Sequence, residues 1–223
     1  MDSAIPYARS GRTAQKARTQ AALVDAAVEL LARGDAATVE AAAALAGVGR
    51  GTAYRYFPNQ RALIAAAHPT ATADSMLPSP APSDPRERLR IVVEEITRMT
   101  AATEPALRTM LRLSLEEHPD ARTTPLRVGR RIVWVDEALG PLANDVDPVQ
   151  LKALTIAIAA VCGIEVYVWL KDIAGLSAND AAGLQRWIAE ILLAGGLDAH
   201  APAAPPTTTV MTAIRSRVDG GHP

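Results

Sequence analysis

Residues 47–59 of the chain read GVGRGTAYRYFPN. A short helix that starts near Arg50 would place Ala53 and Phe57 on one face, because residues four apart lie one above the other on a helix. The opposite face would then carry Arg50, Gly51, Thr52, Tyr54 and Arg55. Arginine and hydroxyl side chains are well suited to bind phosphate oxygens and base edges. The stretch therefore predicts a helix with one packed face and one face suited to nucleic acid.

Three further helices are predicted around this stretch. The first spans residues 13–33 and follows a loose, polar segment at 1–12. The second spans residues 39–46 behind a capping Thr38, and the fourth follows a capping Asn59. Short helices joined by a tight turn that contains glycine are the helix-turn-helix pattern.

A proline-rich stretch separates this region from the rest of the chain. Pro69 interrupts any helix, and residues 78–83 read PSPAPS. Helical patterns return from Asp84 onward, each beginning beside a proline or a capping residue. We expect an all-α chain with an N-terminal domain at 1–68 (core 13–67), a linker at 69–83, a helical effector-binding and dimerisation domain at 84–196 and a flexible tail at 197–223.

Two long apolar segments close the second domain. The first, residues 147–174, opens at Asp147-Pro148 and continues for more than twenty residues without a pair of helix breakers, and Glu165 is the only charge between Ala153 and Leu170. That length is at the lower limit of a membrane span. A helix buried in a protein core or a subunit interface explains it better, because nothing else in the sequence is typical of a membrane protein. Together with the amphipathic segment 177–194, it is expected to form a homodimer interface as a four-helix bundle.

Composition and charge narrow the class of protein. The net charge is −1, but residues 1–66 carry +3 and the remainder −4, which places the cationic surface in the N-terminal domain. Cys162 is the only cysteine and lies in an apolar run, so a buried, inert thiol is expected and an intramolecular disulfide is excluded. The N-terminus lacks the apolar core of a signal peptide, which favours the cytoplasm.

Motifs for other chemistries are absent from the sequence. Gly47, Gly49 and Gly51 lack the preceding strand of a dinucleotide-binding loop, and Thr52 stands where that loop has its next glycine. The four histidines do not have the spacing of a metal site, and no GxSxG nucleophile motif occurs. We therefore expect no catalytic residue, no metal and no cofactor.

The segment from Thr38 to Leu63, TVEAAAALAGVGRGTAYRYFPNQRAL, resembles the DNA-binding signature of TetR-type (tetracycline-repressor-like) transcriptional regulators. The resemblance implies that Arg50, Gly51, Thr52 and Arg55 face the major groove. It also implies that Thr52, Tyr54 and Tyr56 touch phosphates or nearby bases, although Tyr56 could instead pack over Phe57. The complete set of expected DNA-binding residues is Thr38, Arg50, Gly51, Thr52, Tyr54, Arg55, Tyr56 and Arg61.

Three departures from the family pattern bear on DNA binding. Gln60 stands where the family has a lysine that contacts phosphate, and Arg61 beside it is the candidate substitute. The second helix has an acid at Glu40 and a small residue at Ala42 where a bulky aliphatic residue is usual. Pro69 shortens the fourth helix, which in relatives links the ligand site to the DNA-binding unit. We expect weaker packing of the small domain and an altered route of coupling.

The resemblance also implies a small-molecule effector that binds within the second domain. Candidate polar and aromatic ligand-binding residues are Arg108, Arg112, Arg130, Trp134, Glu165, Tyr167 and Trp169. A charge in an apolar run requires a partner, and an arginine could supply one to Glu165. The predicted function is that of a homodimeric repressor of transcription that binds double-stranded DNA and is released by a small molecule. The alternative is a helical small-molecule-binding or catalytic protein whose helix-turn-helix no longer binds DNA.

Overall fold

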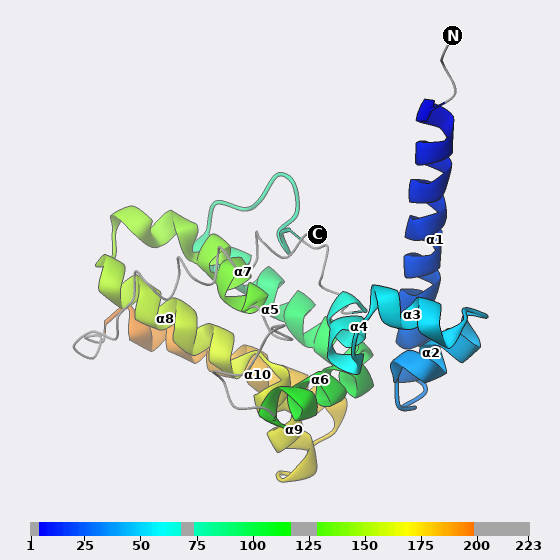
Figure 1. Cartoon of the computed structure of the whole chain (residues 1–223). Coiled ribbons are helices and arrows are strands. Elements are labelled where there is room, and N and C mark those ends of the chain that lie inside the picture. The colour runs from blue at the N-terminus through cyan, green and yellow to red at the C-terminus, as the bar shows by residue number, and fades with distance from the viewer. Residues whose placement is uncertain (1–4, 68–73, 117–128, 199–223) are drawn as a thin grey trace. The chain divides into compact units, whose positions relative to one another are not determined.

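The structure, a computed structural model, describes residues 5–67, 74–116 and 129–198, with side chains from residue 13 onward (Figure 1). Every regular element in those ranges is a helix, so the expected all-α class is confirmed. By its internal contacts the chain divides into two compact units. The first comprises residues 1–72 and 112–126, and the second comprises residues 73–111 and 127–223.

The first unit contains four helices from the N-terminal part of the chain. They are α1 (Ile5–Ala32), α2 (Val39–Leu45), α3 (Arg50–Tyr56) and α4 (Gln60–Ala66). Helix α1 packs against α2 and α4, and α2 packs against α3. Four residues in this core, one from α1, one from α2, one from α3 and one from α4, are fully inaccessible to solvent: Leu23, Ala42, Ala53 and Leu63. Apolar burial therefore holds the four helices together.

Local capping interactions set the ends of these short helices. The hydroxyl of Thr38 accepts a hydrogen bond from the Ala41 amide at 3.1 Å, and the Asn59 side chain accepts one from the Ala62 amide at 2.8 Å. Between α2 and α3 the chain reverses at Gly47, whose φ of 65° is costly for a residue with a Cβ. The predicted caps and glycine turn of the helix-turn-helix are confirmed.

Helix α1 is longer than predicted. It begins at Ile5, whereas the sequence predicted a loose segment over residues 1–12. Residues 5–12 lack the apolar periodicity from which an amphipathic helix is predicted. Helical backbone hydrogen bonds can form without that periodicity, so the helix can extend through a polar segment. Pro6 lies in the first turn, where a missing amide is tolerated.

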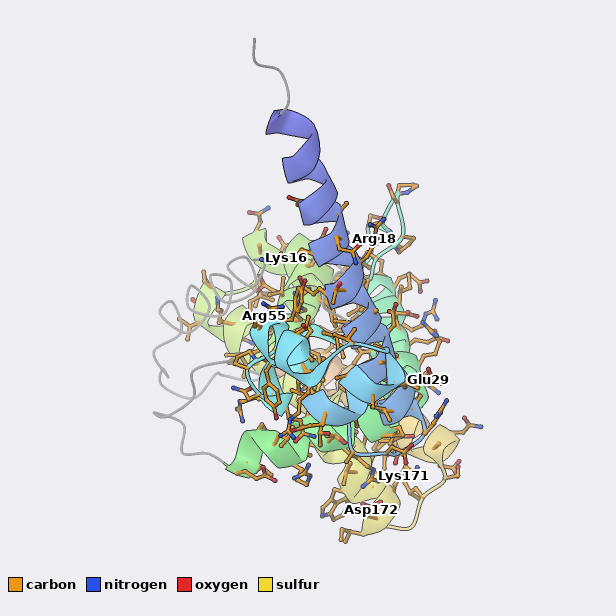
Figure 2. The ribbon with its side chains drawn as sticks, turned by 45° about the vertical axis from the view of Figure 1, so that its right-hand side comes forward. Lys16, Arg18, Glu29, Arg55, Lys171 and Asp172 are labelled. Carbon is orange, nitrogen blue, oxygen red and sulfur yellow. The ribbon has the colours of Figure 1, made fainter. Side chains whose placement is uncertain are left out.

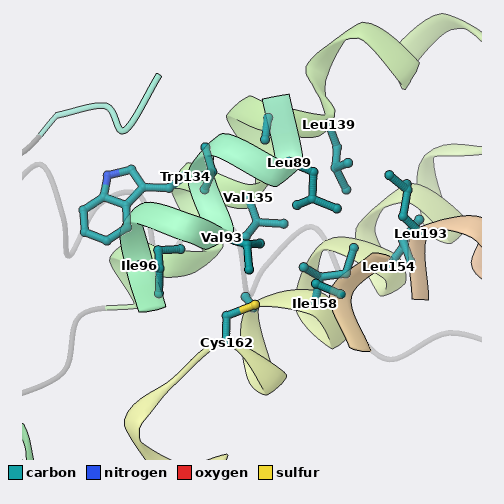
Figure 3. Packing of buried hydrophobic residues seen from close by; sticks show 14 residues of the cluster. Leu89, Val93, Ile96, Trp134, Val135, Leu139, Leu154, Ile158, Cys162 and Leu193 are labelled. Atoms are coloured by element: carbon teal, nitrogen blue, oxygen red, sulfur yellow. The ribbon is translucent and has the colours of Figure 1, made fainter. Parts of the chain in front are cut away.

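The second unit is built mainly from α5 (Pro85–Ala102), α7 (Arg130–Leu139), α8 (Pro148–Val161) and α10 (Ala178–Gly196). Helix α5 packs against α7 and α10, and α8 packs against the same two helices. Figure 3 shows the apolar side chains at the centre of this arrangement, which include Leu89, Val93, Ile96, Trp134, Val135, Leu139, Leu154, Ile158, Cys162 and Leu193. A short 3₁₀ helix, Gly140–Asn144, follows α7 directly and lies in the connection between α7 and α8.

The expected single helix over residues 147–174 is wrong. The structure breaks it at Cys162 and Gly163 into α8 and α9 (Ile164–Asp172), which are bent by 43°. Tertiary contacts at Gly163 explain the break, because the Arg131 side chain occupies the space that a Cβ of residue 163 would fill. No single helix in the described ranges is long and apolar enough to cross a membrane. Helices α8 and α9 reach the necessary length and hydropathy only when they are counted together across their bend.

Helix α6 (Glu104–Glu116) contributes to both units. Its residues up to Leu111 group with the second unit, and those from Arg112 group with the first. The expected domain spanning 84–196 assigned all of this helix to one side. Pro69 and the tail beyond Asp198 lie outside the described residues, so the predictions made for them are not tested, although α4 already ends at Ala66.

Candidate nucleic-acid interface

Helix α3 presents two chemically different faces, as its sequence predicts. Ala53 is fully buried and Phe57, directly after the helix, is 4% exposed, so one side belongs to the core of the first unit. Arg50, Gly51 and Arg55 are exposed, and Thr52 is half-buried. Figure 2 shows Arg55 on α3 and two more exposed cations, Lys16 and Arg18, on α1. The outward face of α3 therefore offers guanidinium and hydroxyl groups that core packing does not use.

Arg50 and Tyr54 are both held by Glu40 from the neighbouring helix α2. A single carboxylate oxygen, Oε1, accepts a hydrogen bond from Arg50 Nη2 at 3.0 Å and a second from the Tyr54 hydroxyl. The Arg50 guanidinium also lies 5.7 Å from the centroid of the Tyr54 ring, within the range of a cation–π contact. The acid whose position departs from the family pattern is therefore in contact with two of the expected DNA-binding residues.

These hydrogen bonds shift the protonation of both partners. The bond from Tyr54 is the main reason that the pKa of Glu40 lies below its ordinary value, and the same bond raises the pKa of Tyr54. The carboxylate therefore stays charged and the phenol stays neutral at neutral pH. Both groups lie at the surface, so the contact is open to exchange with solvent or with another anion.

Arg55 is the basic residue of α3 whose side chain points away from this cluster of contacts. Its guanidinium donates to the Thr52 hydroxyl at 3.2 Å, and both residues face the polar side of the helix. A guanidinium with most of its donors exposed can bind a guanine edge or a phosphate in a bidentate manner. Arg55 and Thr52 thus present their polar groups together on the outward face of α3.

Two other expected residues, Tyr56 and Thr38, contribute in a different way, and Gln60 stands where the family has its lysine. Tyr56 is half-buried beside the core residue Phe57, as the packing interpretation allowed. Thr38 is half-buried and its hydroxyl caps α2, so that oxygen already accepts a backbone amide. Gln60 forms the first residue of α4 and is half-buried.

The interpretation of Arg61 as a phosphate contact needs correction. Arg61 is only 8% exposed, and its Nη1 donates to the backbone carbonyl of Leu113 in α6 at 2.8 Å. Adjacent residues on a helix point about 100° apart, so a position next to the expected lysine faces a different surface. Arg61 therefore ties α4 to the final turns of α6 within the first unit and is not available at the polar face of α3.

The predicted effector-binding residues do not converge on one place. Trp134 is 2% exposed in the main core and Tyr167 is fully buried, whereas Trp169 is 56% exposed. Arg112 pairs with Glu116 one turn later on α6, and Arg130 is half-buried at the start of α7. These residues are therefore spread over core, surface and both units.

Arg108 belongs to an ion-pair cluster that joins α6 to α9. It donates to both carboxylate oxygens of Asp172 at 2.6 and 2.7 Å and to Glu104 at 2.8 Å, while Lys171 contacts Glu104 at 2.6 Å. The hydrogen bond to Asp172 is the main cause of a raised pKa for Arg108. Burial alone would raise the pKa of Glu104, but hydrogen bonds from Lys171 and Arg108 leave it below its ordinary value. Only Arg108 of this cluster was singled out from the sequence.

The predicted arginine partner of Glu165 exists, and it is Arg131. The Arg131 Nη2 atom lies 3.1 and 3.2 Å from the two carboxylate oxygens. Gln185 of α10 completes this region, because its Nε2 donates to the carbonyls of Val161 and Gly163 at 2.9 Å each. Sequence analysis missed both residues: Arg131 follows the selected Arg130 by one position, and Gln185 lies in an amphipathic repeat that favours a surface position.

Comparison with known proteins gives two findings. Residues 23–67, from the middle of α1 to the end of α4, match the family described as bacterial regulatory proteins, tetR family. Over 192 residues the chain is 29% identical to the HTH-type transcriptional repressor KstR of Rhodococcus jostii (strain RHA1). That alignment covers 82% of this chain and 86% of the relative, so the similarity extends well beyond the helix-turn-helix.

Proposed function

We propose that the chain is a ligand-responsive repressor of transcription, because residues 23–67 match the tetR family of bacterial regulatory proteins. As a homodimer it would bind a near-palindromic DNA site and be released by a small molecule. The observation that carries this proposal is the polar face of α3. Arg50, Thr52 and Arg55 project from a helix whose other side is buried, and no packing role explains them.

DNA binding follows from the geometry expected for such a helix. α3 would enter the major groove, with Arg55 and Thr52 at base edges and Arg50 and Tyr54 at phosphates. The exposed Lys16 and Arg18 of α1 add cationic groups to the same unit. In a dimer, two copies of α3 would meet successive major grooves roughly 34–36 Å apart.

Exposed apolar side chains support a homodimer through α9 and α10. Trp169 and Ile173 lie four residues apart on and just after α9, and Trp187 and Ile191 have the same spacing on α10. Their exposed fractions are 56%, 71%, 57% and 48% in that order. Large apolar residues at helical spacing on two neighbouring helices are costly in water, and a twofold axis would bury both copies in one four-helix bundle.

The effector is proposed to bind in the second unit. Polar groups at the edge of its core include the Arg131–Glu165 pair and Gln185, whose Oε1 is buried without a hydrogen-bond partner among the described residues. An effector must bind one dimer geometry more tightly than another, because only differential affinity shifts such an equilibrium. Helix α6 is one covalent route between the units, because its residues belong to both.

The test is binding of the purified protein to the DNA that flanks its own gene. We expect a specific complex at low salt whose affinity falls steeply as salt rises, since each phosphate contact releases counterions. Arg55→Ala should weaken the complex about tenfold or more, because one base-reading arginine contributes about 1–3 kcal/mol. The control is Arg33→Ala, which removes an exposed arginine of the same charge directly after α1 in the same unit.

Failure of a folded dimer to bind that DNA at low salt would overturn the repressor proposal. It would favour the alternative of a helical small-molecule-binding protein, for which the engagement of Arg50 and Tyr54 by Glu40 is the supporting observation. Equal losses for Arg55→Ala and Arg33→Ala would show that binding depends on general charge and would remove Arg55 from the base-reading role.

A further inference from the structure

Glu40 occupies the hydrogen-bonding groups with which α3 would hold DNA. Its Oε1 accepts from Arg50 Nη2 at 3.0 Å and from the Tyr54 hydroxyl, so one oxygen serves both residues. The side chains remain accessible, with exposed fractions of 73% for Arg50 and 40% for Glu40. The cluster lies on the polar side of α3, and the opposite side of that helix is in the core.

We propose that Glu40 is a built-in competitor for DNA phosphate, which must be displaced before Arg50 and Tyr54 can bind the backbone. This inference rests on the proposed DNA-binding function and adds to it a residue that lowers the affinity for DNA of any sequence. A carboxylate oxygen and a phosphate oxygen accept the same charge-assisted hydrogen bonds from a guanidinium or a phenol. In the free protein Glu40 therefore takes the place of the phosphate.

Tyr54 makes this competition exclusive. A phenol has a single O–H, and that hydrogen is donated to Glu40. Tyr54 cannot donate to a phosphate while this bond exists, although Arg50 has further donors and could bind both. The raised pKa of Tyr54 keeps its hydroxyl protonated, so the choice of acceptor persists across neutral pH.

The position of the carboxylate adds a second cost to DNA binding. Both partners of Glu40 are phosphate contacts in the proposed complex, so the negative charge of Glu40 would lie close to the DNA backbone and be repelled by it. Exposed ion pairs are weak in water, so the contact is exchangeable and does not block the face permanently. Glu40 therefore lowers affinity without preventing binding.

The effect should fall to a similar degree on specific and non-specific DNA. Binding to random sequence depends on phosphate contacts alone, and a specific site adds base contacts to the same phosphate contacts. The proposed base contacts come from Arg55 and Thr52, whose side chains hydrogen-bond to one another at 3.2 Å. Glu40 thus weakens the contacts common to all DNA and lowers specific and non-specific affinity by a similar factor.

The experiment measures the binding of two labelled duplexes by fluorescence anisotropy at low salt: the DNA flanking the protein's own gene and a scrambled duplex of the same length and composition. The variants are Glu40→Gln, Glu40→Ala and the matched control Glu29→Gln. Glu29 lies on α1 in the same unit, is exposed and pairs with Arg33 (Figure 2). Its substitution therefore removes one negative charge from the unit without touching the hydrogen bonds of Arg50 and Tyr54. Thermal unfolding confirms that each variant is folded.

We expect Glu40→Gln and Glu40→Ala to bind the scrambled duplex about three- to tenfold more tightly than wild type, since a weak ion pair and one repulsive charge are removed. Affinity for the flanking DNA should rise by a similar factor, because the same phosphate contacts form there. Glu29→Gln should resemble wild type on both duplexes. An NMR titration should also show a lower pKa for Tyr54 in Glu40→Gln, because the hydrogen bond that raises it is lost.

Equal affinities for wild type, Glu40→Gln and Glu29→Gln would overturn the proposal that Glu40 competes with DNA phosphate, and would leave the repressor proposal intact. Weaker binding by Glu40→Gln would also overturn it, because Glu40 would then be a positioning residue for Arg50 and Tyr54. Binding of neither duplex by wild type or any variant would overturn the proposed function and the competitor together. Binding by Glu40→Gln alone would support the role of Glu40 as a competitor and would overturn the repressor proposal, because the wild-type protein would not bind.

Discussion

Two arginine–carboxylate pairs in this protein have nearly the same geometry and different surroundings. Arg50 contacts Glu40 at 3.0 Å between α3 and α2, and Arg131 contacts Glu165 at 3.1 Å between α7 and α9. The arginine is 73% exposed in the first pair and 24% exposed in the second. Distance alone therefore does not reveal what a pair does, because burial decides whether it can exchange its partner.

The Arg131–Glu165 pair is fixed by the chain around it. A Cβ at Gly163 would lie 1.2 Å from Arg131 Nη1 and 2.3 Å from Glu165 Oε2, so the pair occupies the space left by that glycine. Gln185 donates hydrogen bonds to the carbonyls of Val161 and Gly163 at the helix break, and the Gly163 carbonyl also accepts the Tyr167 amide at 3.1 Å. At the surface of α3, by contrast, nothing encloses Glu40 and Arg50 in this way.

The largest expected difference between the pairs is in stability. Arg131→Met should lower the free energy of unfolding by about 1–3 kcal/mol, because it leaves a half-buried carboxylate without its cation. Arg50→Met should leave the urea midpoint at the wild-type value, since both of its partners keep their water. Equal shifts in urea unfolding would show that the two pairs do not differ as their burial implies.

Gly163→Ala tests the same enclosure without removing a charge. The φ of Gly163, −101°, suits alanine, so the obstacle is the collision of the new Cβ with the Arg131 and Glu165 side chains. We expect a loss of about 1–3 kcal/mol in urea unfolding, the range for overfilling a packed site. Gly195→Ala is the control, because a Cβ there meets nothing within 4 Å and a helical glycine replaced by alanine gains about 0.5–1 kcal/mol. A neutral Gly163→Ala would mean that Arg131 moves aside freely.

The ion pairs of Glu104 with Lys171 and Arg108 should make a contribution to stability that depends on pH. The folded pKa of Glu104 lies below its ordinary value of 4.5, so its contribution to stability is complete above that pH and is lost as pH falls through the lowered pKa. Glu104→Gln should therefore be less stable than wild type at neutral pH, and the difference should shrink in acid below about pH 4.5. Urea unfolding at several pH values measures it, and a difference independent of pH would exclude the ion pairs as its source.

The smallest expected effect is that of Glu40→Gln on folding. Glu40 lies at the surface and its partners keep their solvent, so the thermal midpoint should match that of wild type while DNA affinity changes. A clear fall in the thermal midpoint would assign Glu40 a structural role in joining α2 to α3. The exposed Glu40–Arg50 pair would then contribute to folding stability, as is expected of Arg131–Glu165.

Local features of this fold were predictable from sequence because they involve neighbouring residues. The caps Thr38 and Asn59, the glycine turn before α3 and the burial of Ala53 and Phe57 depend on contacts within a few positions. The long α1 was underestimated at its N-terminus, where a polar sequence carries no amphipathic signal although the helix forms.

Long-range contacts account for the predictions that failed or fell short. The burial of Arg61 depends on the Leu113 carbonyl, which is 52 positions away, and the break at Gly163 depends on Arg131 in another helix. The occupation of Arg50 and Tyr54 by Glu40 likewise requires the packing of α2 against α3.

By itself, the sequence determined the all-helical class, the helix-turn-helix and the polar face of α3. Periodicity and capping suffice for these, because they act over one or two turns of helix. Only the tertiary structure decided which charged side chains meet: Glu40 with Arg50 and Tyr54, Glu165 with Arg131, and Arg61 with α6. A side chain's partner depends on which surfaces pack together, and hydrophobic packing between distant segments sets those surfaces.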